Sequence, residues 1–257
     1  MNEPHAQAAL ERALDDREQL VLLYQPIHDA VSGRIVSAEA LLRQRRENGE
    51  LREAKIIHEA AEASRGDEIF ELDHYLVRKA YTDAARWQTK HPDVRLNVNI
   101  SPREFEGRGM VTRLRELVTS CGIDPSRVNI EMTETHYIEQ PEDPIGVLRA
   151  LRDEGLLLRL DDFGTRHSTL THIQHFPING IKIPGEFVAT LPADRRCAAI
   201  VRAIIRMAHD LDLELIAEGI ERPEQLDFLR ELGCHSIQGF LFSKPMEVEE
   251  LVSLMES

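Results

Sequence analysis

Short apolar segments rich in β-branched residues alternate with stretches of helical spacing through almost the whole 257-residue chain, and this alternation constrains the fold most strongly. Strands that alternate with helices predict a parallel sheet, and eight such strands predict closure into a barrel. The predicted strands cover residues 20–27, 35–42, 94–100, 128–132, 156–161, 180–183, 213–217 and 236–242. The predicted helices cover residues 54–64, 68–90, 104–121, 144–154, 168–176, 195–211 and 223–232.

Turn and cap residues agree with these segments. Gly155 and Gly233 stand directly after predicted helices, as C-terminal caps do, and Pro223 suits a first helical turn. Residues 31–34 are too few to hold a crossover helix between the first two strands, and the Ser32-Gly33 pair favours a tight turn. The first two strands are therefore predicted to be antiparallel neighbours in an α/β fold, a (β/α)8 barrel of the TIM type.

The chain is predicted to form one domain with an N-terminal addition, because no linker, repeat or low-complexity run divides it. Ala9, Leu10, Ala13 and Leu14 have the spacing of an amphipathic helix. We therefore expect residues 1–19 to form a helix packed on the barrel, and residues 20–257 to form the barrel domain.

Composition excludes several partners. A formal net charge of −14 opposes binding to a DNA or RNA duplex, which needs a basic face. The longest apolar stretches are too short to enter and cross a bilayer, and the N-terminus lacks the pattern of a signal peptide. Three widely spaced cysteines (Cys121, Cys197 and Cys234) suit free thiols in a reducing compartment. The sequence thus predicts a soluble, cytoplasmic protein without direct membrane insertion.

Polar side chains stand at the carboxyl end of each predicted strand, which is where barrels of this kind form their active sites. These residues are Gln25, Glu39, Asn99, Glu131, Asp161, Asp162, Lys182, Glu218 and Gln238. Oxygen ligands without histidine or cysteine favour Mg²⁺ or Mn²⁺ over Zn²⁺. Two adjacent aspartates can serve two metal ions, as in phosphoryl transfer, and a lysine can orient the hydroxide or balance charge. Proton abstraction beside a carbonyl, and salt bridges at the barrel mouth, are the alternatives.

The same residues resemble the motifs of the EAL domains, a family of bacterial cyclic di-GMP phosphodiesterases. Glu39-Ala40-Leu41-Leu42-Arg43 is similar to the motif that names the family. The other motifs follow in the family's order over roughly residues 20–255: Tyr24-Gln25-Pro26-Ile27, Asn97-Val98-Asn99-Ile100-Ser101, Glu131-Met132-Thr133-Glu134, Asp161-Asp162-Phe163-Gly164-Thr165, Lys182-Ile183, Ala217-Glu218-Gly219-Ile220-Glu221 and Gln238-Gly239-Phe240.

The resemblance implies a barrel with an antiparallel first strand, a homodimer, and cleavage of cyclic di-GMP to linear pGpG with Mg²⁺ or Mn²⁺. It implies that one metal ion is held by Glu39, Asn99, Glu131 and Asp161. A second would be held by Asp161 and Asp162, with Glu218 nearby through water. Lys182 would position the nucleophilic water, and Glu134 would anchor the loop after Asp162. Contacts with the ligand, or support of the site, would come from Gln25, Arg43, Glu221 and Gln238.

The chain departs from the family pattern near the second metal position. Arg166 stands where the family has a glycine, His167 where it has an aromatic residue, and Pro184 where it has an aspartate. Asn179 also replaces a usual aspartate. Two hypotheses follow: a metal-dependent phosphodiesterase, slowed by these changes, or a receptor that binds cyclic di-GMP without cleaving it. The complete set of metal ligands favours the enzyme.

Overall fold

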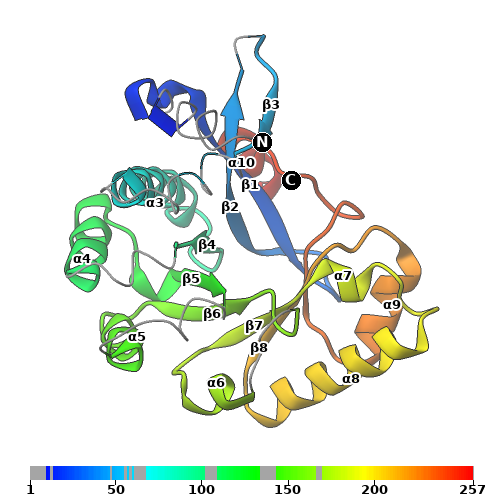
Figure 1. The fold of residues 1–257 in the computed structure, drawn as a ribbon. Helices are drawn as coiled ribbons and strands as arrows, with labels where there is room; N and C mark the ends of the chain where they lie inside the picture. Colours follow the sequence, from blue (N-terminus) through cyan, green and yellow to red (C-terminus); the bar gives the residue numbers. More distant parts are fainter. Residues whose placement is uncertain are drawn as a thin grey trace.

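The computed structural model describes residues 10–11, 14–46, 48–54, 57, 60, 68–101, 109–133, 143–165 and 170–256. In this part of the chain, eight strands close into a barrel with helices on the outside (Figure 1). The barrel strands are β1 (Leu20–Asp29), β2 (Ile35–Arg45), β4 (Arg95–Asn99), β5 (Val128–Thr133), β6 (Leu157–Asp161), β7 (Gly180–Ile183), β8 (Glu214–Ala217) and β9 (Ser236–Ile237). A further short strand, β3 (Leu51–Glu53), pairs with the end of β2.

The direction of the strands matches the prediction. β1 runs antiparallel to both of its neighbours, β2 and β9. The remaining neighbours in the barrel, from β2 through β4 to β9, pair in parallel. The predicted (β/α)8 barrel with an antiparallel first strand is therefore confirmed.

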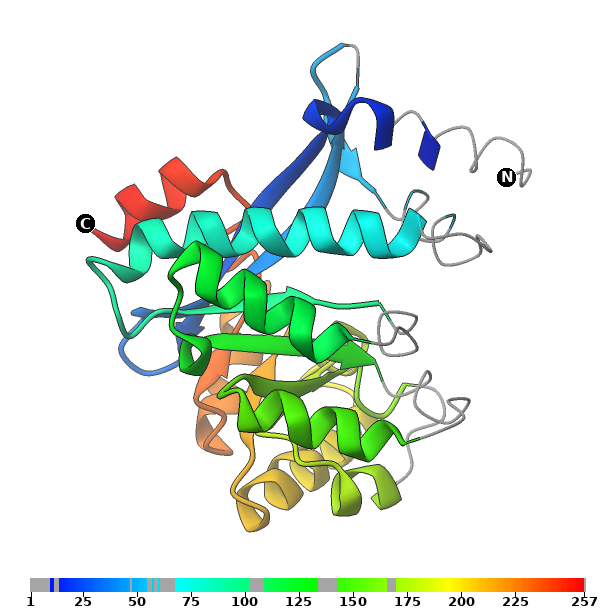
Figure 2. The same ribbon diagram turned by 90° about the vertical axis from the view of Figure 1, so that its left-hand side faces the viewer.

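Eight α-helices have both ends within the described part of the chain, and they cover the outside of the barrel. They are α3 (Glu68–Gln88), α4 (Met110–Cys121), α5 (Pro144–Asp153), α6 (Leu170–His175), α7 (Gly185–Val188), α8 (Arg195–Asp210), α9 (Pro223–Glu231) and α10 (Val248–Met255). Figure 2 shows α3, α4 and α5 side by side along one flank of the strands. Gly155 and Gly233 adopt positive φ after α5 and α9, and Pro223 opens α9, as predicted.

The prediction of the last strand is wrong after Ile237. Beyond this point the backbone turns back on the preceding loop: the amide of Leu241 donates to the carbonyl of Ile220 (3.0 Å). Gly239 lies so close to the backbone of Ile220 that a Cβ would collide with it. The apolar run of residues 240–242 therefore forms a loop at the mouth of the barrel. The helices α7 and α10 and the strand β3 were not predicted.

The core has an apolar shell and a polar interior. Leu, Ile, Val and Ala side chains fill the space between strands and helices. Inside the barrel, by contrast, the strands bury Glu39, Asn97, Glu131, Arg159 and Lys182. Charged groups are rarely buried without partners, so this interior requires an explanation beyond packing.

The N-terminal segment contributes to a smaller apolar cluster. Leu10 is fully buried beside Leu20, Ile69 and Leu72. Residues 10–11 and 14–15 are helical. The division of the chain at residue 19 stays a prediction, and most of the predicted helix 54–64 lies outside the described residues.

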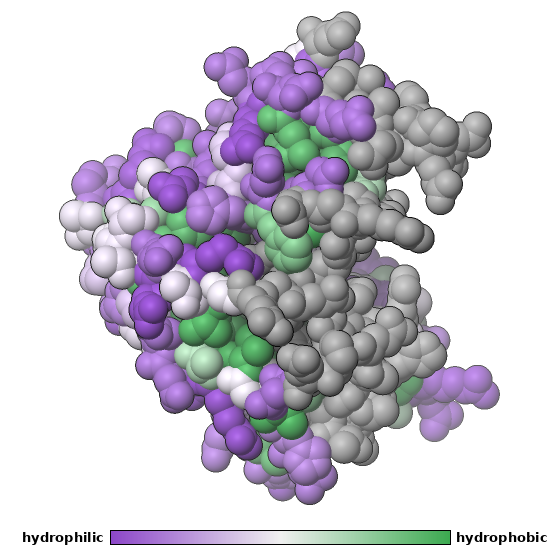
Figure 3. Space-filling model, turned by 60° about the vertical axis from the view of Figure 1, so that its left-hand side comes forward, coloured by the Kyte–Doolittle hydropathy of each residue, from purple (hydrophilic) through white to green (hydrophobic). Residues whose placement is uncertain are grey.

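The outer surface is mainly hydrophilic on the flank that carries α3, α4 and α5. Figure 3 shows hydrophilic side chains predominating among the coloured atoms there, with apolar ones in separate patches between them. None of the described helices combines the length and hydrophobicity that a membrane span requires. Cys121, Cys197 and Cys234 are free thiols, as predicted.

Candidate active site

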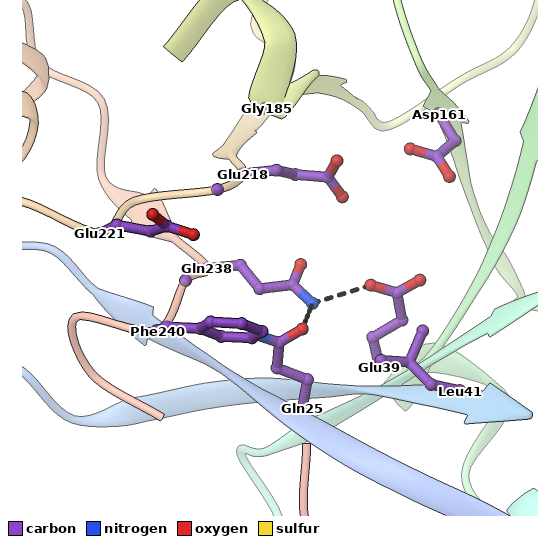
Figure 4. Close-up of a pocket in the computed structure, with 11 residues that line it drawn as sticks. Gln25, Glu39, Leu41, Asp161, Gly185, Glu218, Glu221, Gln238 and Phe240 are labelled. Atoms are coloured by element: carbon purple, nitrogen blue, oxygen red, sulfur yellow. Dashed lines mark hydrogen bonds between the residues drawn. The ribbon is translucent and has the colours of Figure 1, made fainter. Parts of the chain in front are cut away.

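A pocket of about 370 Å³ opens at the mouth of the barrel where the parallel strands have their carboxyl ends. The strand register explains why polar residues meet there: β1 places Gln25 opposite Glu39 of β2, and β5 places Thr133 opposite Asp161 of β6. Six residues that the sequence singled out line the pocket (Figure 4): Gln25, Glu39, Asp161, Glu218, Glu221 and Gln238.

Lys182 of β7 lies below this pocket and is only 1% exposed. Its ammonium Nζ is 2.6 Å from Oε1 of Glu218, 2.9 Å from Oε2 of Glu131 and 3.1 Å from Oε2 of Glu39. Oδ1 of Asp161 lies 3.5 Å away. Each carboxylate comes from a different part of the barrel, so closure of the sheet brings them together. One ammonium thus faces four carboxylates, and Arg159 lies near only one of them, so a further cation would be stabilised here.

A chain of amide side chains holds Glu39 in place. Gln238 donates from Nε2 to Oε2 of Glu39 (2.8 Å) and to Oε1 of Gln25 (3.2 Å) (Figure 4). Asn99 donates from Nδ2 to the other oxygen of Glu39 (2.8 Å). The Nε2 group of Gln25 in turn donates to the carbonyl of Ser243 (3.2 Å). Because both oxygens of Glu39 accept from fixed donors, its carboxylate has a defined orientation.

Glu131 is fully buried one strand away from Asn99. Its Oε1 accepts a hydrogen bond of 2.5 Å from Nδ2 of Asn97, and its Oε2 faces Lys182. Burial raises the pKa of Glu131 to about 8, with the charge of Lys182 opposing the shift and Glu39 and Asp161 adding to it.

Burial and the charges around the ammonium also shift the pKa values of Glu218, Glu39 and Lys182 itself. Burial also raises the pKa of Glu218, to about 7. For Glu39, burial is outweighed by Lys182 and by the amides of Gln238 and Asn99, so its pKa is lowered. Burial disfavours the charged form of Lys182, but the surrounding carboxylates prevail and hold its pKa well above the ordinary value.

A tight turn after β6 orients the two aspartates. Asp162 adopts a left-handed conformation (φ 52°), which is uncommon for residues other than glycine and clusters at functional sites. Its amide donates to Oδ1 of Asp161 (2.9 Å), and its carbonyl accepts from Thr165 (3.0 Å). As a result, single carboxylate oxygens of Asp161, Asp162 and Glu218 all lie within 4.8 Å of one another. Such a group of oxygen donors fits a hard divalent cation.

The structure does not bring Arg43 into the pocket, and Glu134 lies outside the described residues. Arg43 belongs to β2 beyond Leu41, and its Nη1 donates to the carbonyl of Leu42 (2.9 Å); it does not line the pocket. Glu134 lies outside the described residues, as do Arg166 and His167. Pro184 is buried and precedes the first turn of α7.

Phe240 is a lining residue to which the sequence interpretation assigned no role. Its side chain is 54% exposed, and Nζ of Lys244 lies 5.7 Å from the centre of its ring. The sequence does show an aromatic residue directly after Gln238-Gly239. The predicted strand over residues 236–242, however, implied that this residue is part of the core. A close approach of Gly219 to Gly185 shapes the same wall: a Cβ on Gly219 would lie 3.0 Å from Cα of Gly185.

The raised pKa values predict how the site responds to pH. Glu131 and Glu218 are largely protonated at pH 6 and ionised at pH 9, and metal ions bind ionised carboxylates. We expect the melting temperature gained on adding Mg²⁺ to increase from pH 6 to pH 9. Without metal, the folded protein holds protons that an unfolded glutamate would release, so its stability should fall as pH rises through about 7 and 8.

Thermal unfolding at pH 6 and pH 9, with and without Mg²⁺, measures both trends. Glu131→Gln is the control, since it should remove part of the pH dependence of the metal-free protein. A metal-free melting temperature that rises between pH 6 and pH 9 would contradict this picture of the site.

Comparison with known proteins agrees with this geometry. Residues 7–245 match the EAL domain family. Over 249 residues the chain is 33% identical to the cyclic di-GMP phosphodiesterase NbdA of Pseudomonas aeruginosa, a match that covers 96% of this chain and 31% of that protein. The chain spans 28% to 35% of the length of the first curated relatives that it matches.

Solved structures give the same result. The complex of the MucR phosphodiesterase of Pseudomonas aeruginosa with c-di-GMP is similar with a TM-score of 0.88 and 32% identity, covering 95% of this chain and 99% of that one. The manganese and c-di-GMP complex of BlrP1 of Klebsiella pneumoniae is similar with a TM-score of 0.78 and 29% identity, covering 89% and 56% of the two chains. The chain belongs to the EAL domain family.

Proposed function

We propose that this chain hydrolyses cyclic di-GMP to linear pGpG in a reaction that requires Mg²⁺ or Mn²⁺. The observation that carries the proposal is the convergence of four carboxylates, those of Glu39, Glu131, Asp161 and Glu218, on one buried ammonium beneath an open pocket. The names of relatives support the same substrate, because NbdA is a cyclic di-GMP phosphodiesterase and MucR was solved with this ligand.

The donor set fits two divalent cations. Glu39, Asn99, Glu131 and Asp161 would hold one ion, and Asp161 with Asp162 would hold the second, with Glu218 nearby through water. All of these donors are carboxylate or amide oxygens, which Mg²⁺ and Mn²⁺ prefer. When bound, such ions supply an activated water and neutralise charge on a transferred phosphoryl group.

The chain's own residues then position the water and the ligand. The carboxylates around Lys182 keep it protonated, so its Nζ serves as a hydrogen-bond donor that orients the water. A protonated lysine is poorly suited to the alternative of proton abstraction beside a carbonyl, which needs a neutral base. Gln25, Glu221 and Gln238 line the pocket and present polar groups to the ligand. The roles assigned to Arg43 and Glu134 stay predictions.

Phe240 offers a flat apolar surface for a guanine base. An exposed aromatic ring on a pocket wall is a stacking platform, and a stacked base contributes about 1–3 kcal/mol to binding. We expect Phe240→Ala to weaken binding of cyclic di-GMP roughly tenfold, measured by calorimetry. Leu211→Ala is the control, because Leu211 is also half-exposed but lies outside the pocket. Equal affinities for the two variants would exclude Phe240 as a platform.

Incubation of the full chain with cyclic di-GMP and Mg²⁺ or Mn²⁺, followed by chromatography, tests the proposed reaction. The appearance of pGpG supports the enzyme. Tight binding of cyclic di-GMP without product, with Mg²⁺ and with Mn²⁺ alike, would instead identify a receptor. Absence of binding would exclude both functions. The homodimer and the cytoplasmic location stay predictions; light scattering of the purified chain tests the first.

A further inference from the structure

A second cavity, of about 390 Å³, lies at the opposite mouth of the barrel, where the parallel strands begin. Its walls come from residues near the start of β2, β4, β5, β8 and β9, from Arg159 in the middle of β6, and from segments that precede these strands. It is therefore separated from the candidate active site by the polar interior of the barrel. Its side chains include three arginines and two histidines against two carboxylates: Arg95, Arg127, Arg159, His209 and His235 with Asp93 and Glu214.

The charge in this cavity is opposite to that of the whole chain. The formal net charge of the protein is −14, yet the arginines of the cavity outnumber its carboxylates. Arg95 donates from Nη1 to both oxygens of Glu214 (2.7 and 2.8 Å). Arg127 lies 3.4 Å from the exposed carboxylate of Asp93. Glu214 is thus the carboxylate around which the cluster is organised.

Arg159 is the innermost member of the cluster and is only 2% exposed. Its Nη2 donates to Oε2 of Glu214 (2.8 Å). Its Nε and Nη1 are also buried, and no described group accepts a hydrogen bond from either; Oε1 of Glu131 is 4.0 Å from Nη1. Leaving buried donors of a charged group without acceptors costs free energy. Burial accordingly lowers the pKa of Arg159, against the effect of Glu131 and Glu214.

We propose that this cavity is a second ligand site, which binds a small molecule carrying a phosphate or a similar oxoanion. Arg95 and Arg127 supply charge-assisted hydrogen bonds to the anion from the rim, and the buried guanidinium of Arg159 adds positive charge beneath it. Guanidinium groups match the geometry of phosphate, and the cavity volume lies within the range of small-molecule sites. Glu214 competes with the anion for the same donors.

Because Glu214 competes with the anion, substitutions of Arg95 and of Glu214 should change the affinity for phosphate in opposite directions. The probe is inorganic phosphate, titrated into the full chain without divalent metal, so that the candidate active site does not bind it through metal ions, and followed by calorimetry. Arg95→Gln removes one positive charge and should weaken binding about tenfold. Glu214→Gln removes the competing carboxylate and should strengthen binding by about the same factor. Arg115→Gln is the matched control, because Arg115 pairs with Glu154 outside the cavity and should leave the affinity unchanged.

A second measurement locates the anion. The ring signals of His209 and His235 in NMR spectra should shift on addition of phosphate, while the ring of His74 on α3 should not. The proposal is overturned if millimolar phosphate does not bind, if both cavity variants change affinity in the same direction, or if the control changes it as much as they do. A merely structural ion cluster would lower stability in Arg95→Gln and Glu214→Gln without opposite effects on binding.

Discussion

Asp161→Asn is expected to lower the turnover of cyclic di-GMP roughly a thousandfold, because one side chain serves both proposed metal positions. Oxygen atoms of Asp161, Asp162 and Glu218 lie within 4.8 Å of one another, and Oδ1 of Asp161 is 3.5 Å from the ammonium of Lys182. Asparagine has the same shape and retains an oxygen that can accept the amide of Asp162, so the turn after β6 should persist. The loss is therefore expected in catalysis and not in folding.

The metal-free stability of this variant provides the internal check. Removing one of four carboxylates around a single ammonium relieves repulsion, so the melting temperature without metal should stay the same or rise. The increase on adding Mn²⁺ should shrink or vanish. Asp210→Asn is the matched control, since Asp210 pairs with Arg206 on the surface of α8 and should leave turnover unchanged. Near-normal turnover by Asp161→Asn would show that the two-metal assignment is wrong.

Lys182→Met is expected to destabilise the metal-free protein by about 3 kcal/mol, because loss of one partner leaves buried carboxylates without their counter-charge. Glu131 is fully buried, Glu39 is 5% exposed, and both lie within 3.1 Å of Nζ. Methionine fills a similar volume, so the loss reports charge and hydrogen bonding more than packing. Urea unfolding measures the change.

Two conditions separate this effect from a general defect. Mg²⁺ should restore part of the lost stability, since it supplies cationic charge to the same carboxylates. The loss should also be smaller at pH 6, where the raised pKa values of Glu131 and Glu218 favour their neutral forms. Lys79→Met is the control: Lys79 is 38% exposed and 3.9 Å from Asp83, so its loss should cost less than about 1 kcal/mol. If Lys182→Met is as stable as this control, Lys182 does not supply the counter-charge that stabilises the buried carboxylates.

Much of the barrel was predictable because its signals are local. β-branched alternation marks strands, and the short turn at residues 31–34 between the first two strands cannot hold a crossover helix, which fixes the antiparallel β1. Residues 238–242 misled the prediction, because Phe240, Leu241 and Phe242 resemble a buried strand. Their loop depends on contacts with Ile220, about twenty residues away in sequence, which local pattern does not contain.

The site shows the same division between local and long-range information. Carboxylates at strand ends identified the mouth of the barrel, but the meeting of Lys182 with four of them depends on closure of the sheet. Arg43 shares a strand face with Glu39 and Leu41, yet β2 continues past the barrel to pair with β3, where Arg43 is opposite Glu53. Arg159 gave no functional signal in sequence, because its burial beside Glu214 depends on two strands that are not neighbours.

In the proposed function, one end of this barrel brings divalent metal and cyclic di-GMP together. Anomalous diffraction from crystals of the full chain with Mn²⁺ and cyclic di-GMP tests it most directly. Anomalous peaks are expected within coordination distance of Glu39, Glu131, Asp161 and Asp162, with a phosphate of the ligand beside them in the pocket lined by Phe240. Manganese bound elsewhere, or cyclic di-GMP bound away from these carboxylates, would contradict it.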